Sequence, residues 1–296
     1  MLKNKELYPV EKMCYCLKMS KNAYYNWLKN KNVVNINTSK VHLMSRIADI
    51  FKDSKEVYGS HRIQKMLERE GLFYSRSYVA VLMRKMGLRS VLKRKFVVTT
   101  ESDHSFPIAE NVLNRDFESQ AIGEKWVSDI TYIRVKDDWN YLPVRQAGLT
   151  TIMDLADRKI VGWSLSEDMT VENTVWKAWT SAISRRKTKS NFIFHSDRGV
   201  QYASNKITRM LRENIKINQS MSRKGNCWDN AAAESLFKTI KYECTNRYRF
   251  TSKERLNACL IEYISWYNTK RIHSSLDYKT PQEMQLELEN LINKAA

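Results

Sequence analysis

The segment W-V-S-D-I-T-Y-I, residues 126–133, decides the fold class, because its β-branched and aromatic residues are typical of a buried strand. It also carries an acid, which is unusual in such a strand. Two more segments, R-K-I-V-G-W-S-L-S (158–166) and N-F-I-F-H-S-D (191–197), are short and rich in β-branched and aromatic residues. A helical pattern over residues 170–186 separates them. This order of elements predicts a mixed α/β sheet covered by helices.

Further helices are expected downstream of these strands. Residues 204–214 and 230–243 have helical periodicity, and the polar stretch 219–230 between them predicts a mobile loop. Two more helices are expected, one around residues 252–268 and one after Pro281.

The first hundred residues indicate two helical pairs instead of strands. Residues 9–30 begin with a proline suited to a helix start, and Ser20 is placed to cap a second helix, which is typical of a helix-turn-helix. A second pair is predicted over 61–70 and 78–86, each followed by a glycine that can end a helix.

The net charge of +18 and the pI near 9.6 suggest a polyanionic partner. Nucleic acid is the leading candidate, because neutralising phosphates releases counterions, and an anionic membrane is the alternative. No apolar run approaches the roughly 18–20 residues that a spanning helix needs, and the first ten residues lack the apolar core of a secretory signal. We therefore expect a cytoplasmic protein.

The five cysteines include no C-x-x-C pair, which indicates reduced thiols. A zinc site built from Cys14, Cys16, His42 and His61 is an alternative, although the spacing matches no familiar zinc finger.

Basic side chains gather at the end of the second helical pair, and residues 84–95 contain no acid. They could contact DNA or simply be solvated. The candidates for DNA binding are Arg76, Arg84, Lys85, Arg89, Lys93, Arg94 and Lys95.

Three acids are the candidate catalytic and metal-binding residues. Asp129 lies inside a strand, Asp197 ends another strand at the edge where α/β sheets usually bind ligands, and Glu234 lies in the first turns of a helix. Taken singly, each has an ordinary alternative: a solvent-facing position, a turn, or a helix-start acid favoured by the dipole. Together they could hold two Mg²⁺ ions at a phosphodiester, since Mg²⁺ prefers oxygen ligands.

Two lysines follow the glutamate on the same helical face. Lys238 and Lys241 lie four and seven residues after Glu234 and could hold the phosphate backbone of DNA, although a solvated basic face is the alternative.

Five segments together resemble the transposases of bacterial insertion sequences, specifically the insertion-sequence-three family. They are WVSDITYI (126–133), DLADRKIVGW (154–163), HSDRGVQY (195–202), MSRKGNCWDNAAAESLFKTIK (221–241) and YNTKRIHSSLDYKTP (267–281). The resemblance covers almost the whole chain and is closest to the downstream-frame product of such elements, OrfB.

This resemblance implies a ribonuclease H-like, five-stranded mixed sheet flanked by helices, preceded by an all-α helix-turn-helix region. The family's Asp, Asp, Glu triad falls on Asp129, Asp197 and Glu234, and its basic position falls on Lys241. It implies Mg²⁺, for which Mn²⁺ can substitute, and strand cleavage followed by strand transfer at the ends of the element. The implied partners are double-stranded DNA (terminal inverted repeats and target), an upstream-frame helix-turn-helix protein or a fusion with it, and further copies of the chain on the bacterial nucleoid.

The resemblance also implies domain limits. They are a helix-turn-helix segment at 1–40, a second helix-turn-helix domain at 41–98, a linker at 99–118, the catalytic core at 119–270 and a tail at 271–296.

Two departures from the family pattern stand out. Thirty-six residues separate Asp197 from Glu234, one more than the family usually carries. Residues 143–149 (P-V-R-Q-A-G-L) interrupt a passage that the family writes continuously, and Pro143 and Gly148 suit a turn better than a central strand. This segment is either an extended hairpin or a disruptive insertion that displaces Asp129.

The insertion leaves two alternatives to an active transposase: an inactive DNA-binding regulator of the element, and a related-fold nuclease that uses water. His195 is expected to be packed or hydrogen-bonded, and Trp228 either stacks on DNA or anchors its loop. Arg271 and His273 either touch DNA or hold the fold together.

Overall fold

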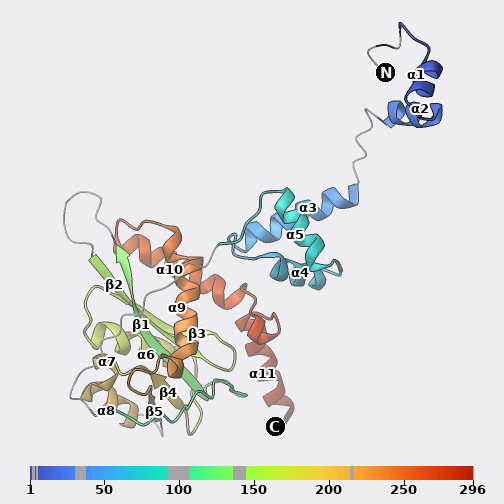
Figure 1. The fold of residues 1–296 in the computed structure, drawn as a ribbon. Helices are drawn as coiled ribbons and strands as arrows, with labels where there is room; N and C mark the ends of the chain where they lie inside the picture. Colours follow the sequence, from blue (N-terminus) through green and yellow to red (C-terminus); the bar gives the residue numbers. More distant parts are fainter. Residues whose placement is uncertain are drawn as a thin grey trace. The chain divides into compact units, whose positions relative to one another are not determined.

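The computed structural model describes residues 1, 4, 6–30, 38–91, 107–135, 145–213 and 217–295. The chain divides into two compact units, Met1–Asp49 and Ile50–Ala296 (Figure 1). The helices at the start of the chain are α1 (Val10–Cys16), α2 (Lys21–Asn30) and α3 (Thr38–Asp53), the last of which crosses the boundary. The later elements are, in order, α4 (Ser60–Arg69), α5 (Arg76–Lys85), β1 (Lys125–Val135), β2 (Arg145–Asp154), β3 (Ile160–Ser166), the π-helix η2 (Glu172–Trp176), α6 (Lys177–Arg185), β4 (Ile193–Ser196), α7 (Val200–Ala203), α8 (Asn205–Glu213), β5 (Asn218–Met221), η3 (Cys227–Asn230), α9 (Ala231–Glu243), η4 (Thr245–Arg247), α10 (Lys253–Thr269), η5 (Ser274–Leu276) and α11 (Pro281–Ala295).

The first predicted helical pair, α1 and α2, is present. Pro9 stands directly before α1, and the backbone turns between the two helices at Lys18, whose φ is 50°. The hydroxyl of Ser20 accepts a hydrogen bond from the Ala23 backbone N–H at 3.0 Å, which caps the start of α2 as expected.

The second predicted pair, α4 and α5, is also present. Gly71 and Gly87 follow the two helices with φ values of 77° and 71°, a left-handed conformation in which glycine has no Cβ penalty. Ser75 caps α5 by accepting from the Tyr78 N–H at 3.2 Å. The sequence analysis did not predict α3, which precedes this pair.

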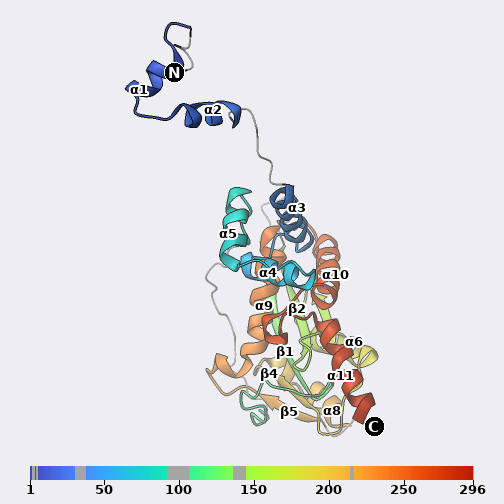
Figure 2. The ribbon, with the colours of Figure 1, turned by 90° about the vertical axis from the view of Figure 1, so that its right-hand side faces the viewer.

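One five-stranded sheet, in the order β3-β2-β1-β4-β5, forms the centre of the second unit (Figures 1 and 2). β1, β2 and β3 pair antiparallel, whereas β4 and β5 join β1 on its other side in parallel. Helix α6 packs on β2 and β3, and helix α9 contacts β1. This mixed sheet with flanking helices is the ribonuclease H-like arrangement, which confirms the expected fold class.

The unusual segment before Leu149 extends the sheet without disturbing it. Arg145 to Leu149 belong to β2, and the ladder with β1 runs without a shift from Val135↔Arg145 to Trp126↔Asp154. Gly148 lies inside the strand, opposite Tyr132, so the prediction of a turn there was wrong. The alternative of a disruptive insertion is likewise wrong, because Asp129 keeps its regular partner Thr151. Pro143 lies outside the described residues.

The polar stretch at 219–230 is not wholly a loop. Its first residues belong to β5, which pairs with β4 from Ile193↔Asn218 to Ser196↔Met221. N-Q-S-M has little β-branched or alternating character, so the strand forms through its place at the sheet edge and not through local propensity.

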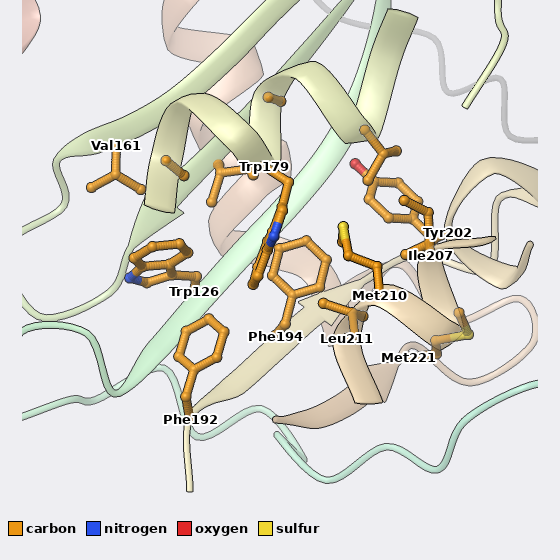
Figure 3. Close-up of a cluster of buried hydrophobic side chains, with 14 of the residues drawn as sticks. Trp126, Val161, Trp179, Phe192, Phe194, Tyr202, Ile207, Met210, Leu211 and Met221 are labelled. Carbon is orange, nitrogen blue, oxygen red and sulfur yellow. The ribbon is translucent and has the colours of Figure 1, made fainter. Parts of the chain in front are cut away.

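An aromatic core lies between the sheet and the helices α6 to α8 (Figure 3). Trp126 packs edge-on against Phe192 at 4.9 Å between ring centroids, and Trp179 packs the same way against Phe194 at 5.1 Å. Because side chains alternate along a strand, Trp126 and Ile130 turn toward this core, and Asp129 turns to the opposite face of the sheet, where α9 lies.

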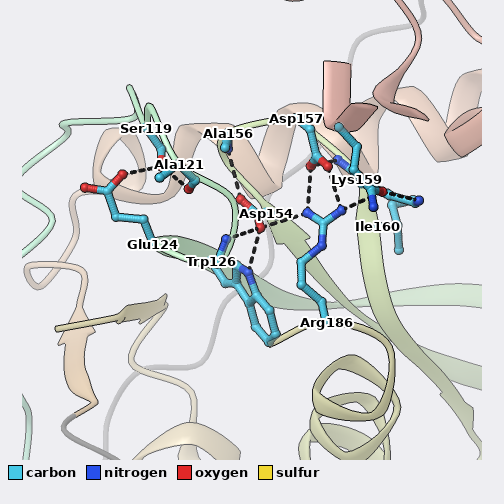
Figure 4. A network of polar contacts seen from close by, with 12 residues as sticks. Ser119, Ala121, Glu124, Trp126, Asp154, Ala156, Asp157, Lys159, Ile160 and Arg186 are labelled. Carbon is cyan, nitrogen blue, oxygen red and sulfur yellow. Dashed lines mark hydrogen bonds and ion pairs between the residues drawn. The ribbon is translucent and has the colours of Figure 1, made fainter. Parts of the chain in front are cut away.

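A buried ion network holds the turn between β2 and β3 (Figure 4). The guanidinium of Arg186 donates to Asp154 at 2.8 Å and to Asp157 at 2.6 Å, and all three side chains are buried. Asp154 also accepts from the Trp126 indole N–H and from the Gly123 backbone N–H. Every charge in this network is thus paired, as buried charges must be.

Helices α10 and α11 confirm the two helices predicted near the end of the chain. Within the described ranges, no helix is both long enough and apolar enough to cross a membrane.

Candidate active site

The pairing of β1 with β4 places two of the three candidate acids next to each other. The parallel register runs from Lys125↔Ile193 to Val127↔His195. Asp129 lies two residues further along β1, and Asp197 is the residue that directly follows β4. The negative charge of Asp197 acts on the Asp129 carboxyl, so the two acids are close neighbours.

Helix α9 supplies the third acid. Ala233, Leu236, Phe237 and Ile240 are buried, which fixes the rotation of the helix. Glu234 is half-buried in its first turn, with Lys238 and Lys241 one and two turns further on. Because α9 contacts β1, these side chains share the face of the sheet on which Asp129 lies.

The charges of the three acids affect one another. Burial raises the pKa of the Asp129 carboxyl well above its ordinary value, and the negative charges of Asp197 and Glu234 raise it further. The backbone N–H of Ile130 and the ammonium group of Lys241 act in the other direction. Burial lowers the pKa of Lys241, and Asp129 partly counters that effect. The site therefore brings mutually repelling carboxyl groups close together, with Lys241 as a partial counter-charge.

The acids do not form a closed metal cage. Among the residues the structure describes, no three His, Cys, Asp or Glu side chains surround one point closely enough to hold an ion, and this also excludes the zinc cluster from those residues. Glu234 is instead drawn toward Lys238, whose Nζ lies 3.6 Å from Oε2.

The donor set still fits a divalent cation such as Mg²⁺. All three side chains offer hard carboxylate oxygens, and Mg²⁺ binds through few carboxylates while keeping waters and substrate phosphate. Burial, followed by the negative charges of Asp197 and Glu234, raises the pKa of Asp129, and a bound cation would offset these effects.

Asp229, which the sequence analysis did not single out, anchors the start of α9. It is buried and accepts from Arg115 at 2.7 Å and from Arg223 at 2.8 Å. Hydrogen bonds from the Arg223 side chain hold the pKa of Asp229 far below its usual range. An aspartate next to a helix start, preceded by an arginine six residues earlier, was the available sequence signal.

A second set of contacts ties α9 to β1 beside Asp129. The side-chain amide of Asn230 donates to the Ser128 carbonyl at 3.3 Å. The Ser128 hydroxyl bonds with the Tyr202 hydroxyl at 2.7 Å, and burial next to Asp129 and Asp197 raises the pKa of Tyr202 well above 10.0. Tyr202 therefore stays an uncharged packing residue beneath the acids.

His195 has the structural role expected of it. It is fully buried, its Nδ1 lies 2.9 Å from the Ser220 hydroxyl, and burial lowers its pKa to about 4. Trp228 is 69% exposed, so it does not anchor its loop in the core.

Arg271 and His273 belong to a buried network. Arg271 donates twice to Glu243 at the end of α9, both at 2.7 Å, and its guanidinium also lies 3.2 Å from the His273 ring. The Tyr263 hydroxyl completes the network by donating to Glu243 at 2.8 Å. These contacts indicate that the two residues hold α9 against α10.

The candidate DNA-binding side chains of the helical region are all exposed where the structure describes them. Arg76, Arg84 and Lys85 lie on α5, and Arg89 follows it. Lys93, Arg94 and Lys95 lie outside the described residues. These four cations are exposed, whereas Val79 and Leu82 of the same helix are buried.

Comparison with known families agrees with this architecture. Residues 119–227 and 215–281 match two families described as the integrase core domain, and residues 38–96 match an HTH-like domain. Among solved structures, the catalytic core domain of BIV integrase aligns with 58% of this chain and 99% of its own, with 15% identity and a TM-score of 0.40. The class is thus a protein with a helix-turn-helix-like region followed by an integrase core.

Curated relatives narrow the class. The chain is 34% identical over 285 residues to Transposase InsF for insertion sequence IS3A of Escherichia coli (strain K12), covering 96% of each protein. It is 36% identical over 271 residues to the insertion element IS600 uncharacterized 31 kDa protein of Shigella sonnei, covering 91% of this chain and 96% of that one. The chain belongs to the IS3 family of insertion-sequence transposases.

Proposed function

We propose that this transposase cuts DNA at the ends of its insertion sequence and joins the exposed 3′-hydroxyl to a new phosphodiester. Asp129, Asp197 and Glu234 are the catalytic residues and would hold the divalent cations. The observation that carries the proposal is that the charges of Asp197 and Glu234 both act on the Asp129 carboxyl, in a region where β4 pairs with β1 and α9 contacts β1.

Each side chain has a defined part in this proposal. When bound, Mg²⁺ supplies charge stabilisation for the attacking and leaving oxygens of the phosphodiester. Asp129 lies within β1 and Asp197 directly follows β4, so the paired strands would fix the place of reaction. Glu234 exchanges its contact with Lys238 for the cation. Lys241, half-buried near Asp129, would pair with a DNA phosphate next to the reacting bond.

The helical region is proposed as the part that grips the ends of the element. The exposed cations Arg76, Arg84, Lys85 and Arg89 would contact phosphates, and Lys93, Arg94 and Lys95 continue the run in the sequence. The net charge of +18 supports a DNA partner. The domain limits 1–40, 41–98, 99–118, 119–270 and 271–296, a homo-oligomer on DNA and an upstream-frame partner belong to the same proposal.

A strand-transfer assay tests the function. The purified chain, alone and fused to the upstream frame, is mixed with a labelled duplex of the element's end and Mg²⁺. We expect nicked products and joined molecules, and a loss of at least about 100-fold with Asp129→Asn, Asp197→Asn or Glu234→Gln. Asp168→Asn is the matched control, since Asp168 is an exposed loop acid bonded to Thr170 and Asn173.

Three results would contradict the proposal in different ways. Equal activity in the three variants would rule out these acids. Free 3′-hydroxyls without joined molecules would point to a nuclease that uses water. Tight binding without any metal-dependent cleavage in either form would point to a regulator.

A further inference from the structure

A cavity separate from the candidate active site lies on a different face of α9 from Glu234. It has a volume of about 320 Å³ and is bounded by the start of α9, the end of α10, the turn after β2 and the segment before β1. Ser235 and Thr239, one helical turn apart, mark the side of α9 that it touches. The described residues that line it are Phe117, Met153, Arg158, Ala231, Ala232, Ser235, Leu236, Thr239, Tyr267, Arg271, His273 and Ser275.

The walls of this cavity are positively charged. Arg158 and Arg271 both line it, and no acid is among its described lining residues. Arg271 is neutralised by Glu243, but Arg158 forms no ion pair with any described carboxylate, and its guanidinium donates only to the Phe117 carbonyl at 3.3 Å. Burial lowers the pKa of Arg158, and Tyr267 and Asp154 offset this only in part, so an anion in contact with its guanidinium would be favourable.

The effect of this charge is visible on His273. Burial lowers the pKa of that imidazole to about 2, and the positive charges of Arg271, Arg62 and Arg158 contribute to the shift. Burial is the main cause of this shift, and the neighbouring cations add to it. The same cations would favour an anion in the cavity.

Hydrogen-bond donors and aromatic rings complete the cavity. The hydroxyls of Ser235, Thr239 and Ser275 make no hydrogen bond to another side chain or to the backbone within the described part of the protein. The first residues of α9, at the positive end of its dipole, form part of the wall. Phe117 and Tyr267 supply aromatic surface.

We propose that this cavity binds a nucleotide, with the phosphate paired to Arg158 and the sugar and base against Phe117 and Tyr267. A volume of about 320 Å³ exceeds what a bare phosphate fills and falls at the small end of ligand sites. The nucleotide is either free or a unit of a bound DNA strand. Only the second source rests on the proposed function.

Calorimetric titration of the full chain with thymidine monophosphate and with inorganic phosphate tests the site. We expect the nucleotide to bind more tightly than phosphate, Arg158→Gln to weaken nucleotide binding at least tenfold, and Arg158→Lys to weaken it less. Arg209→Gln is the matched control, because Arg209 is an exposed arginine on α8 outside the cavity and should leave binding unchanged.

A second variant tests the cavity independently, in case Arg158→Gln fails to fold. Ser235→Leu narrows the cavity from an exposed helix position without removing the cation, and it should also weaken nucleotide binding at least tenfold. The proposal is overturned if the wild-type chain binds neither probe at millimolar concentration, or if both Arg158→Gln and Ser235→Leu bind as the wild type does.

Competition with a short single-stranded oligonucleotide separates the two sources. Displacement of the nucleotide by the oligonucleotide, lost in Arg158→Gln, identifies a unit of DNA as the occupant, and simultaneous binding of both identifies a free nucleotide. Asp129→Asn should still bind thymidine monophosphate, so a failure of the catalytic proposal would leave this result unchanged.

Discussion

Asp129 shows at the scale of one residue how the site differs from the rest of the fold. The buried acids Asp154 and Asp157 are neutralised by Arg186, whereas the pKa of Asp129 is raised by burial and by two like charges. An acid with a raised pKa destabilises the folded state once the pH exceeds its ordinary value, because the carboxylate form is disfavoured there. This cost in stability is of the kind that functional sites commonly carry.

Removal of this charge should therefore stabilise the metal-free protein. We expect Asp129→Asn to raise the free energy of unfolding at pH 7 by on the order of 1 kcal/mol, measured by urea denaturation in chelator. Asp168→Asn should change stability in the opposite direction, since hydrogen bonds from Thr170 and Asn173 lower the pKa of Asp168 to about 2. A loss of stability in Asp129→Asn would contradict the repulsion.

His273 predicts a pH effect. Its folded-state pKa of about 2 lies below the ordinary value of 6.5, so the unfolded chain takes up the proton first and stability falls as the pH drops below 6.5. Between pH 6.5 and 5 this loss amounts to about 2 kcal/mol. Urea unfolding at both pH values should show a smaller loss in His273→Gln and an unchanged loss in the control His61→Gln, a residue on the exposed surface. Equal losses in wild type and His273→Gln would exclude His273 as the cause.

Lys241 should contribute to DNA binding through a phosphate. We expect Lys241→Ala to weaken binding mainly at low and moderate salt and to reduce the salt slope by about one, measured by fluorescence anisotropy across a salt series. Lys206→Ala, which removes an exposed cation paired with Glu172, is the control. An unchanged slope for Lys241→Ala would argue against a phosphate contact.

At the scale of the elements, α6 lies directly against β3 at Gly162. A Cβ added at Gly162 would lie 2.2 Å from the Ala178 carbonyl oxygen and 2.7 Å from the Ala182 side chain. Because the first obstacle is backbone, the helix has to move, whereas a Cβ at Gly148 would meet only the flexible Met169 side chain at 2.8 Å.

Gly162→Ala should thus destabilise the protein and Gly148→Ala should not. We expect a loss of roughly 1–3 kcal/mol for Gly162→Ala in urea unfolding and less than about 0.5 kcal/mol for Gly148→Ala. Similar losses of unfolding free energy in both variants would contradict the close contact between Gly162 and the Ala178 carbonyl of α6.

The same elements show what a sequence can and cannot predict. Local signals sufficed where the cause was local: the Ser20 cap, Gly71 and Gly87, and the strand around Trp126. The short strand β5 was missed because pairing with β4, and not its own composition, makes it a strand.

Long-range contacts limited the prediction of the site. The position of Asp129 inside a strand and of Asp197 at the end of another, together with the family resemblance, pointed to a shared site. The partners of Asp229 and Asp154 did not follow from the sequence, because Arg115 and Arg186 lie 114 and 32 residues away along the chain. Gly148 was misjudged because its strand is set by Tyr132 and Ser166 on both sides.

At the scale of the whole molecule, a strongly basic chain combines helical regions with an integrase core, and its relatives match it over nearly their full length. The central claim is that three acids remote in sequence bind divalent cations together. If they do, binding to the folded state alone must stabilise the protein by mass action.

Thermal unfolding with increasing Mg²⁺ or Mn²⁺ measures this most directly. At about 100 times the dissociation constant, the wild-type Tm should rise by roughly 5–10 °C, and Asp168→Asn should rise equally. Asp129→Asn, Asp197→Asn and Glu234→Gln should each lose most of that rise. An equal rise in all three variants, or no rise in the wild type at any concentration, would contradict a shared cation site.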